Sequence, residues 1–294
     1  MIRYSVTAAK LRQLIEAQSE DWLGRAQEKT EGFRALGRYE ENSSIWSEVK
    51  PVYMELQGES KCAYCERKLE SSDIGRIEQD VEHFRPKGNV KAWKPSQKLK
   101  DLNITFTSVP GEGKGYHLLP YHIFNYAAAC KPCNSTLKKD YFPIAGDYDL
   151  AAENPKTLSD EKAYLIYPIG SVDDDPEDLI EFHGTSPRPV AAVGHKHNRA
   201  LVTIEFFRLD DPNKRKNLYR DRSMVIVGLY PLLEDTTVGT TAEKAAARTK
   251  VKNLLHSGLP HFNCAKSFKR VFESDPVEAR EIYENALRLI STGS

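Results

Sequence analysis

Four of the five cysteines in this chain of 294 residues are arranged as two Cys-x-x-Cys pairs, Cys62/Cys65 and Cys130/Cys133. A spacer of two residues lets one turn supply two thiolate ligands, and four thiolates form the closed tetrahedron that structural Zn²⁺ prefers. A redox site of the thioredoxin type would use a single pair in a βαβ context, which the sequence does not have. The spacing therefore predicts one structural zinc ion per chain, with no open position for catalysis.

Side chains that could hydrolyse a phosphate ester lie between and after the cysteine pairs. Glu82 and His83 end a segment, residues 77–84, that is predicted to be a strand, and Asn134 directly follows Cys133. A neutral imidazole can accept a proton from water, and carboxylate and amide oxygens are ligands for a hard divalent cation. A Glu-His pair alone is common on ordinary surface strands, so the frame of two cysteine pairs and Asn134 is what indicates catalysis.

The order of these residues resembles that of the HNH endonucleases, also called His-Me finger or ββα-metal nucleases. The resemblance implies that His83 is the general base and that Glu82 and Asn134 bind a catalytic Mg²⁺ or Mn²⁺. It also implies that Asn125 braces the loop and orients His83, and that a helix begins at Asn134. Three side chains would hold phosphates: Arg85, Lys87 and Lys138.

A narrower resemblance covers roughly residues 40–225. The segments CAYCER, VEHFRPK, CNSTLKKDYFP and YLIYPIGSVDDDPEDLIEF are similar to the HNH subunits of Septu-type anti-phage defence systems. This resemblance implies a nuclease effector that cuts phosphodiester bonds in DNA and works with a separate ATPase. The residues themselves do not distinguish DNA from RNA. Glu82 departs from the pattern, because many HNH enzymes have Asp or His there.

Charge is distributed unevenly along the chain. The whole sequence is neutral, with 42 basic and 42 acidic residues, whereas residues 61–140 hold 14 basic and nine acidic side chains, a net charge of +5. Such an excess suits a polyanion, although a solvated surface of mixed charge is the alternative. No apolar run is long enough to span a membrane and no secretion signal is evident, so we expect a cytoplasmic protein without membrane contact.

The hydrophobic periodicity predicts a mostly helical frame. The resemblance to the HNH endonucleases implies that a zinc-stapled ββα-metal core is embedded in this frame, so we expect an α+β protein. We expect three regions: N-terminal helices in residues 1–58, the nuclease core in residues 59–146, and a mostly helical C-terminal region in residues 147–294. The predicted helices cover residues 7–37, 45–56, 197–209, 214–230, 242–256, 263–273 and 276–291.

Two alternatives remain open from the sequence. A zinc-knuckle module could bind nucleic acid or protein without cutting it, but such a module has no need for Glu82, His83 and Asn134 together. The terminal helices, in residues 1–58 and 197–292, could dock onto the ATPase or could simply complete a self-sufficient nuclease.

Overall fold

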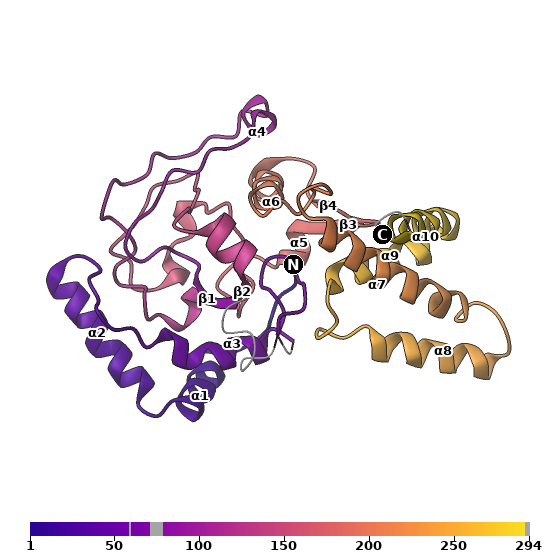
Figure 1. Cartoon of the computed structure of the whole chain (residues 1–294), viewed down its shortest axis with the longest axis horizontal. Coiled ribbons are helices and arrows are strands. Elements are labelled where there is room, and N and C mark those ends of the chain that lie inside the picture. Colours follow the sequence, from indigo (N-terminus) through magenta and orange to yellow (C-terminus); the bar gives the residue numbers. More distant parts are fainter. Residues whose placement is uncertain (59, 71–78, 292–294) are drawn as a thin grey trace.

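The computed structural model covers residues 1–294 and describes all of them except residues 59, 71–78 and 292–294. Over the described residues the chain combines helices with two small sheets, each of two antiparallel strands (Figure 1). This mixture agrees with the predicted α+β class. No helix in the described part of the chain is long and apolar enough to cross a membrane.

The first sheet joins the segment of the acid-His pair to the segment of the second cysteine pair. Strand β1 (Gln79–His83) pairs antiparallel with β2 (Tyr126–Cys130), and His83 lies opposite Tyr126. All of β2 is buried, and its three central alanines let other elements pack closely on it. The strand predicted at residues 77–84 is confirmed over β1, while its first two residues lie outside the described part of the chain.

A short helix, η3 (Pro132–Lys138), follows β2 and completes a strand-strand-helix unit. It is a single π-helical stretch with Pro132 in its first turn, where the missing N–H of proline costs no hydrogen bond. The helix therefore begins two residues before the predicted start at Asn134. It ends at Lys139, whose backbone has a φ of 46° and a ψ of −130°.

The helix predicted over residues 7–37 is two helices, α1 (Ala8–Gln18) and α2 (Trp22–Leu36). The chain turns between them, with Asp21 at a φ of 55°, so that the fully buried Trp22 can pack edge-on against Tyr126 of β2. Burial of a large aromatic side chain on the sheet thus overrides a continuous helical pattern.

The helix predicted over residues 45–56 consists of two pieces, a 3₁₀ turn, η1 (Trp46–Val49), followed by α3 (Lys50–Leu56). As predicted, the α-helical part begins near Pro51. Gln57 follows α3 and is fully buried. Its side chain donates to the carbonyls of Lys61 and Ala128 and accepts from the N–H of Ala128. These three hydrogen bonds fasten the first cysteine turn to β2.

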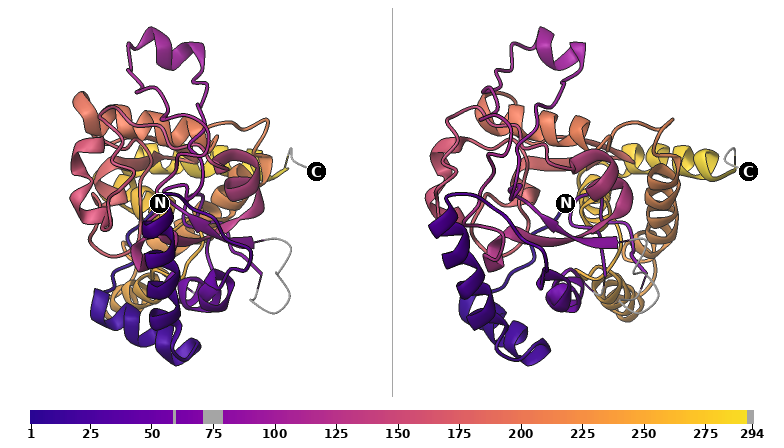
Figure 2. Two further views of the ribbon diagram at one scale, coloured as in Figure 1. Left: turned by 90° about the vertical axis from the view of Figure 1, so that its left-hand side faces the viewer. Right: turned by 60° about the vertical axis from the view of Figure 1, so that its left-hand side comes forward.

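A long arm leaves the core after β1 and projects with α4 near its tip (Figure 2), where Leu99 of α4 packs against Val202 of α6 (Gly194–Phe206). The shorter elements along the arm and the loops that follow are α4 (Gln97–Asp101), η2 (Ile123–Asn125), η4 (Pro155–Thr157), η5 (Ser159–Glu161) and α5 (Pro176–Leu179).

The C-terminal region is less uniformly helical than predicted, because a β-hairpin opens it. Strand β3 (Ile180–His183) pairs antiparallel with β4 (Ser186–Pro189), with Gly184 at a φ of 58° in the turn. The helices then follow close to their predicted positions: α6 (Gly194–Phe206), α7 (Lys216–Glu234), α8 (Thr241–Leu254), α9 (Phe262–Ser274) and α10 (Pro276–Ser291).

One hydrophobic core runs through all three regions expected from the sequence. Tyr64 of the first cysteine turn stacks on Phe207 after α6, with ring centroids 4.1 Å apart. Asn263 of α9 donates to the carbonyls of Met1 and Ile180. The helical regions therefore pack against the central unit and help to build it.

Candidate metal centre and catalytic cleft

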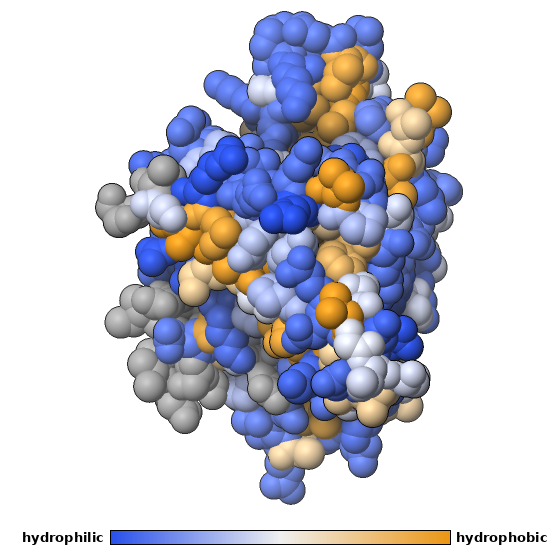
Figure 3. Space-filling model, turned by 90° about the vertical axis from the view of Figure 1, so that its right-hand side faces the viewer, coloured by the Kyte–Doolittle hydropathy of each residue, from blue (hydrophilic) through white to orange (hydrophobic). Residues whose placement is uncertain are grey.

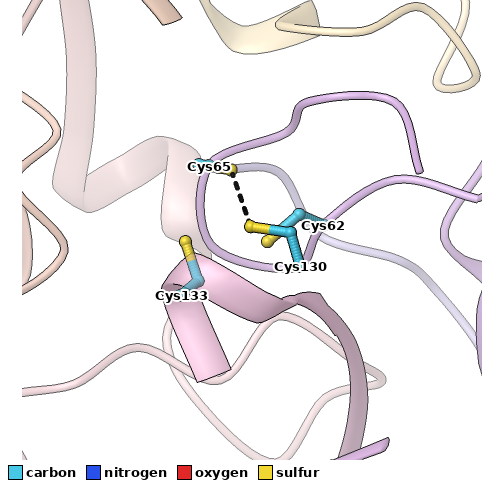
Figure 4. A group of neighbouring side chains, drawn as sticks. All are labelled: Cys62, Cys65, Cys130 and Cys133. Atoms are coloured by element: carbon cyan, nitrogen blue, oxygen red, sulfur yellow. Dashed lines mark hydrogen bonds between the residues drawn. The ribbon is translucent and has the colours of Figure 1, made fainter. Parts of the chain in front are cut away.

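The four paired cysteines converge on one point, with all their sulfur atoms within 4.8 Å of one another (Figure 4). The Sγ atoms of Cys65 and Cys130 are 3.8 Å apart. Zn–S bonds of about 2.3 Å in a regular tetrahedron place sulfur atoms about 3.8 Å apart. The cluster therefore has the donor set and the dimensions of a structural zinc site.

Three pieces of chain supply the ligands. Cys62 and Cys65 come from one turn, Cys130 ends β2, and Cys133 lies in η3. All four are buried and none forms a disulfide. A metal held here would fix the strand-strand-helix unit to the first turn, across 64 intervening residues.

The guanidinium of Arg215, which the sequence pattern did not indicate as part of the site, lies against the cysteine cluster. The Nη2 of Arg215, just before α7, is 3.5 Å from the Sγ of Cys133. The neighbouring sulfurs raise the pKa of this guanidinium above its ordinary value despite burial. Four thiolates around Zn²⁺ carry a net charge of −2, which Arg215 partly offsets. Arg215 and Cys133 are 82 residues apart, so the sequence alone did not indicate this contact.

A cleft of about 760 Å³ opens beside β1 and η3. It brings together three of the residues predicted to catalyse the reaction and one predicted to bind phosphate. The described residues that line it with polar or aromatic side chains include Trp46, Asp80, Glu82, His83, Lys87, Asn134, Lys139 and Asp140. Of the predicted set, Asn125, Arg85 and Lys138 lie outside this lining.

His83 is held as a neutral imidazole at the edge of the cleft. Its Nε2 is 3.2 Å from the carbonyl oxygen of Pro120. Because a carbonyl only accepts, Nε2 must carry the proton, and Nδ1 keeps its lone pair. Burial and the nearby Lys87 lower the pKa of His83 well below its ordinary value. The ring of Trp46 packs edge-on against the imidazole, with centroids 4.9 Å apart.

Glu82 faces the opposite side of β1 and forms a buried ion pair. Its Oε1 is 3.2 Å from the Nζ of Lys138, and the two side chains are 3% and 0% exposed. Burial raises the pKa of Glu82 to about 7, against the opposing effect of Lys138. Among the described atoms neither this oxygen nor this nitrogen has a partner in hydrogen-bonding geometry. A buried carboxylate oxygen without a hydrogen bond is a suitable ligand for a cation.

Asn134 of η3 lines the cleft beside β1 and is oriented by Asp80. The Nδ2 of Asn134 donates to the Oδ2 of Asp80 over 3.3 Å, and Ser135 donates to the same oxygen over 3.4 Å. Because Nδ2 is used in this hydrogen bond, Oδ1 is the atom of the Asn134 amide that could bind a cation. Asp80 and Glu82 share one face of β1, since alternate residues of a strand point the same way. The motif comparison had not selected Asp80.

Asn125 does not line the cleft but joins the chain that follows His83 to the chain just before Pro120. Its fully buried side chain accepts from the N–H of Arg85 and donates to the carbonyls of Arg85 and Leu119. The carbonyl of Asn125 also accepts from the N–H of Phe84. These contacts fix the backbone next to His83 and next to Pro120, while the role of Asn125 in orienting the imidazole stays a prediction.

We expect Asn125→Ala to lower the free energy of unfolding by at least about 2 kcal/mol, because an unsatisfied buried polar group costs about 1–3 kcal/mol. Urea unfolding followed by circular dichroism measures this change. Asn217→Ala, at an exposed position of α7, is the matched control and should change little. Equal midpoints for both variants would contradict the bracing role.

The three predicted phosphate-binding residues have different surroundings. Lys87 lines the cleft, with its Nζ 3.4 Å from the centroid of the Trp46 ring, and burial lowers its pKa to about 8. Arg85 is 6% exposed and pairs with Glu161 over 3.0 Å, so its position does not support contact with a phosphate. Lys138 is fully buried against Glu82.

Lys138→Met should destabilise the protein by about 3–5 kcal/mol, because it leaves the Glu82 carboxylate buried without a counter-charge. The double variant Glu82→Gln/Lys138→Met removes both charges and should recover most of that loss. Urea unfolding at about pH 8, above the pKa of about 7 that Glu82 has in the parent, compares the three proteins. A single variant as stable as the parent would show that the pair carries no such energy.

Comparison with known proteins adds one relative. No family model and no solved structure matches the chain. The chain is 27% identical over 162 residues to the Septu protein PtuB of Bacillus mycoides (strain KBAB4), an alignment that covers 55% of this chain and 48% of that protein. The chain thus spans about half the length of the curated relative it matches. The protein described here, with its cluster of four buried cysteines, is therefore similar to a Septu protein.

Proposed function

We propose that this protein is a metal-dependent endonuclease of the HNH type, which hydrolyses phosphodiester bonds in DNA. The observation that carries the proposal is the position of His83, whose Nε2 is held by the Pro120 carbonyl in a cleft that Glu82 and Asn134 also line. This arrangement suits a general base that activates water.

In this mechanism His83 takes a proton from water at Nδ1 while the Pro120 carbonyl holds the ring. The water oxygen forms a bond to phosphorus, and the bond to the leaving sugar oxygen breaks. Glu82 and Asn134 would hold Mg²⁺ or Mn²⁺, which supplies stabilisation of negative charge on the phosphate and on the leaving oxygen. Lys87 contacts the phosphate from the cleft wall, since it is the lysine of the predicted set that lines the cleft.

The donor set fits a hard divalent cation. The Glu82 carboxylate, which would share its charge with Lys138, and the Oδ1 of Asn134 are both hard oxygen donors. Two protein ligands leave room for water and substrate phosphate in an octahedral shell. The cysteine cluster, with four soft ligands, does not compete for such a cation. The two metals would therefore occupy separate sites.

Incubation of plasmid DNA with the purified protein tests the proposal. We expect nicked or linear DNA when Mg²⁺ or Mn²⁺ is added, and intact DNA without added metal or with EDTA. A protein that shifts DNA in a gel but leaves it intact under every metal condition would favour the alternative, a zinc-knuckle binding module without cleavage activity.

We further propose that the nuclease is the effector of an anti-phage defence system and that an ATPase is its partner. The similarity to the Septu protein PtuB supports this role. The apolar faces of the terminal helices are largely used in the core, so a partner would bind their outer surface. Apolar side chains form separate patches among hydrophilic ones on the side of α8 and α10 (Figure 3). Val277 of α10 is 72% exposed.

Co-expression with the product of the adjacent gene tests the partner. We expect co-elution on size-exclusion chromatography and a cleavage rate that depends on the partner and on ATP. A monodisperse chain that does not bind the adjacent gene product and cuts DNA at full rate alone would favour the other hypothesis, in which the terminal helices complete a self-sufficient nuclease.

A further inference from the structure

A second groove, of about 590 Å³, adjoins the cleft between the α4 arm and the end of α6. Lys139 lines both the groove and the cleft, so the two hollows meet at this residue. Trp93 and Tyr141 offer aromatic surfaces inside the groove. Five basic side chains line it: Lys94, Lys98, Lys139, Arg208 and Lys214.

Two of these basic residues occupy backbone positions that favour glycine. Lys139 has a φ of 46° and a ψ of −130° in a turn closed by the Tyr141 N–H on the Lys138 carbonyl. Arg208 has a φ of 51° at the end of α6, where the next N–H bonds back to the Ile204 carbonyl. Such helix ends usually carry glycine, and a side chain with a Cβ is strained there. Strained residues of this kind cluster at functional sites.

Most of the basic side chains in the groove have no ion-pair partner among the described residues, whereas most of the acidic ones are hydrogen-bonded. Lys94, Lys98, Lys139 and Arg208 are exposed, and none of them forms an ion pair within the part of the chain that the structure describes. Two of the three acidic residues already have partners. Glu205 accepts hydrogen bonds from Ser96, and Asp211 accepts from the backbone of Lys214. The groove therefore presents free positive charge to solvent.

We propose that this groove binds the phosphate backbone of the nucleic acid whose scissile bond lies in the cleft, and that Lys139 and Arg208 contact its phosphates. The inference rests on the proposed nuclease function and extends it to the substrate path. A polyanion that enters the cleft continues past Lys139, where the groove supplies cations and aromatic faces, the two features that bind nucleic-acid strands.

Glycine substitutions separate charge from backbone strain. Lys139→Gly and Arg208→Gly each remove a cation while relieving the positive φ, so both should melt at the same temperature as the parent or higher. Lys162 provides a matched control, because it is also an exposed lysine with a positive φ, 50°, and lies outside the groove and the cleft. Lys139→Arg keeps the charge.

Binding is measured by anisotropy of labelled double- and single-stranded DNA in the His83→Ala background, between about 50 and 200 mM salt. Each phosphate contact contributes about 0.9 to the slope of log affinity against log salt, which corresponds to a loss of about eightfold at 0.1 M salt. We expect that loss for each glycine variant at Lys139 or Arg208. Lys162→Gly and Lys139→Arg should bind as the parent does.

Unchanged affinity and salt slope in the double variant Lys139→Gly/Arg208→Gly would overturn the inference, provided that the parent binds DNA. In that case a parent that still cuts DNA would leave the nuclease function intact. A parent that neither binds nor cuts nucleic acid would overturn the proposed function and this inference together.

Discussion

Replacing His83 with alanine is expected to lower the rate of DNA cleavage by about 10²–10⁴-fold, which is the usual contribution of a general base. The Nε2 of His83 is fixed by the Pro120 carbonyl, the residue lines the cleft, and burial lowers the pKa of the imidazole, which favours its neutral form. Alanine removes the proton acceptor but none of the groups proposed to hold metal. Single-turnover cleavage of a labelled duplex measures the effect, and anisotropy checks that binding is retained.

His117→Ala serves as the control for this prediction. His117 lies in the same central region but does not line the cleft, so its loss should leave the cleavage rate within a factor of about two of the parent, the scatter expected for a surface substitution. Added imidazole should restore part of the activity of His83→Ala, because the vacated space opens into the cleft. If His83→Ala cuts as fast as the parent, the assignment of the base is wrong.

Loss of one cysteine ligand should have the largest effect on stability. Cys62→Ser or Cys130→Ser is expected to unfold the central unit, because structural zinc contributes about 10–16 kcal/mol where whole domains are stable by about 5–15 kcal/mol. A two-stranded sheet and one short helix bury too little surface to replace that energy. Metal analysis should find about one zinc per chain in the parent, and circular dichroism should show the loss of a cooperative melt in the variants.

Cys264→Ser is the matched control for the zinc prediction. Cys264 is also buried, but its Sγ donates to the carbonyl of Gly184 and lies outside the cluster. A serine hydroxyl can make the same hydrogen bond, so this variant should keep both its zinc and its fold. Parent protein purified without chelator that lacks stoichiometric zinc and is nevertheless folded would refute the metal site.

The two predictions depend on different levels of information. The pairing of the cysteines was predictable from their spacing, because two residues between cysteines let two sulfurs approach one metal ion. The pairing of β1 with β2 and the packing of the first turn bring the two pairs together. The positions of β1, α9 and α10 were also predictable. Local rules determine them: alternation along a strand, helical periodicity, and the Asp275 side chain that caps α10 by accepting from the Glu278 N–H.

Other features were decided by residues far apart in the sequence. The pattern of residues 7–37 was helical throughout, yet burial of Trp22 on β2 breaks it. The hairpin of β3 and β4 went unrecognised because its strands are only four residues each. Arg85 had the position of a phosphate ligand, but Glu161, 76 residues away, pairs with its guanidinium inside the core.

The sequence by itself determined which chemical groups this protein has and how they follow one another: four thiolates, an acid-His pair and two asparagines. Only the tertiary structure decided which atoms of those groups are available. Burial raises the pKa of Glu82, and folding places Lys138 beside it. The Pro120 carbonyl selects the tautomer of His83, and the hydrogen bond to Asp80 orients the amide of Asn134. These are properties of neighbours brought together by folding, and residue type and spacing do not encode solvent exposure or a hydrogen-bond partner.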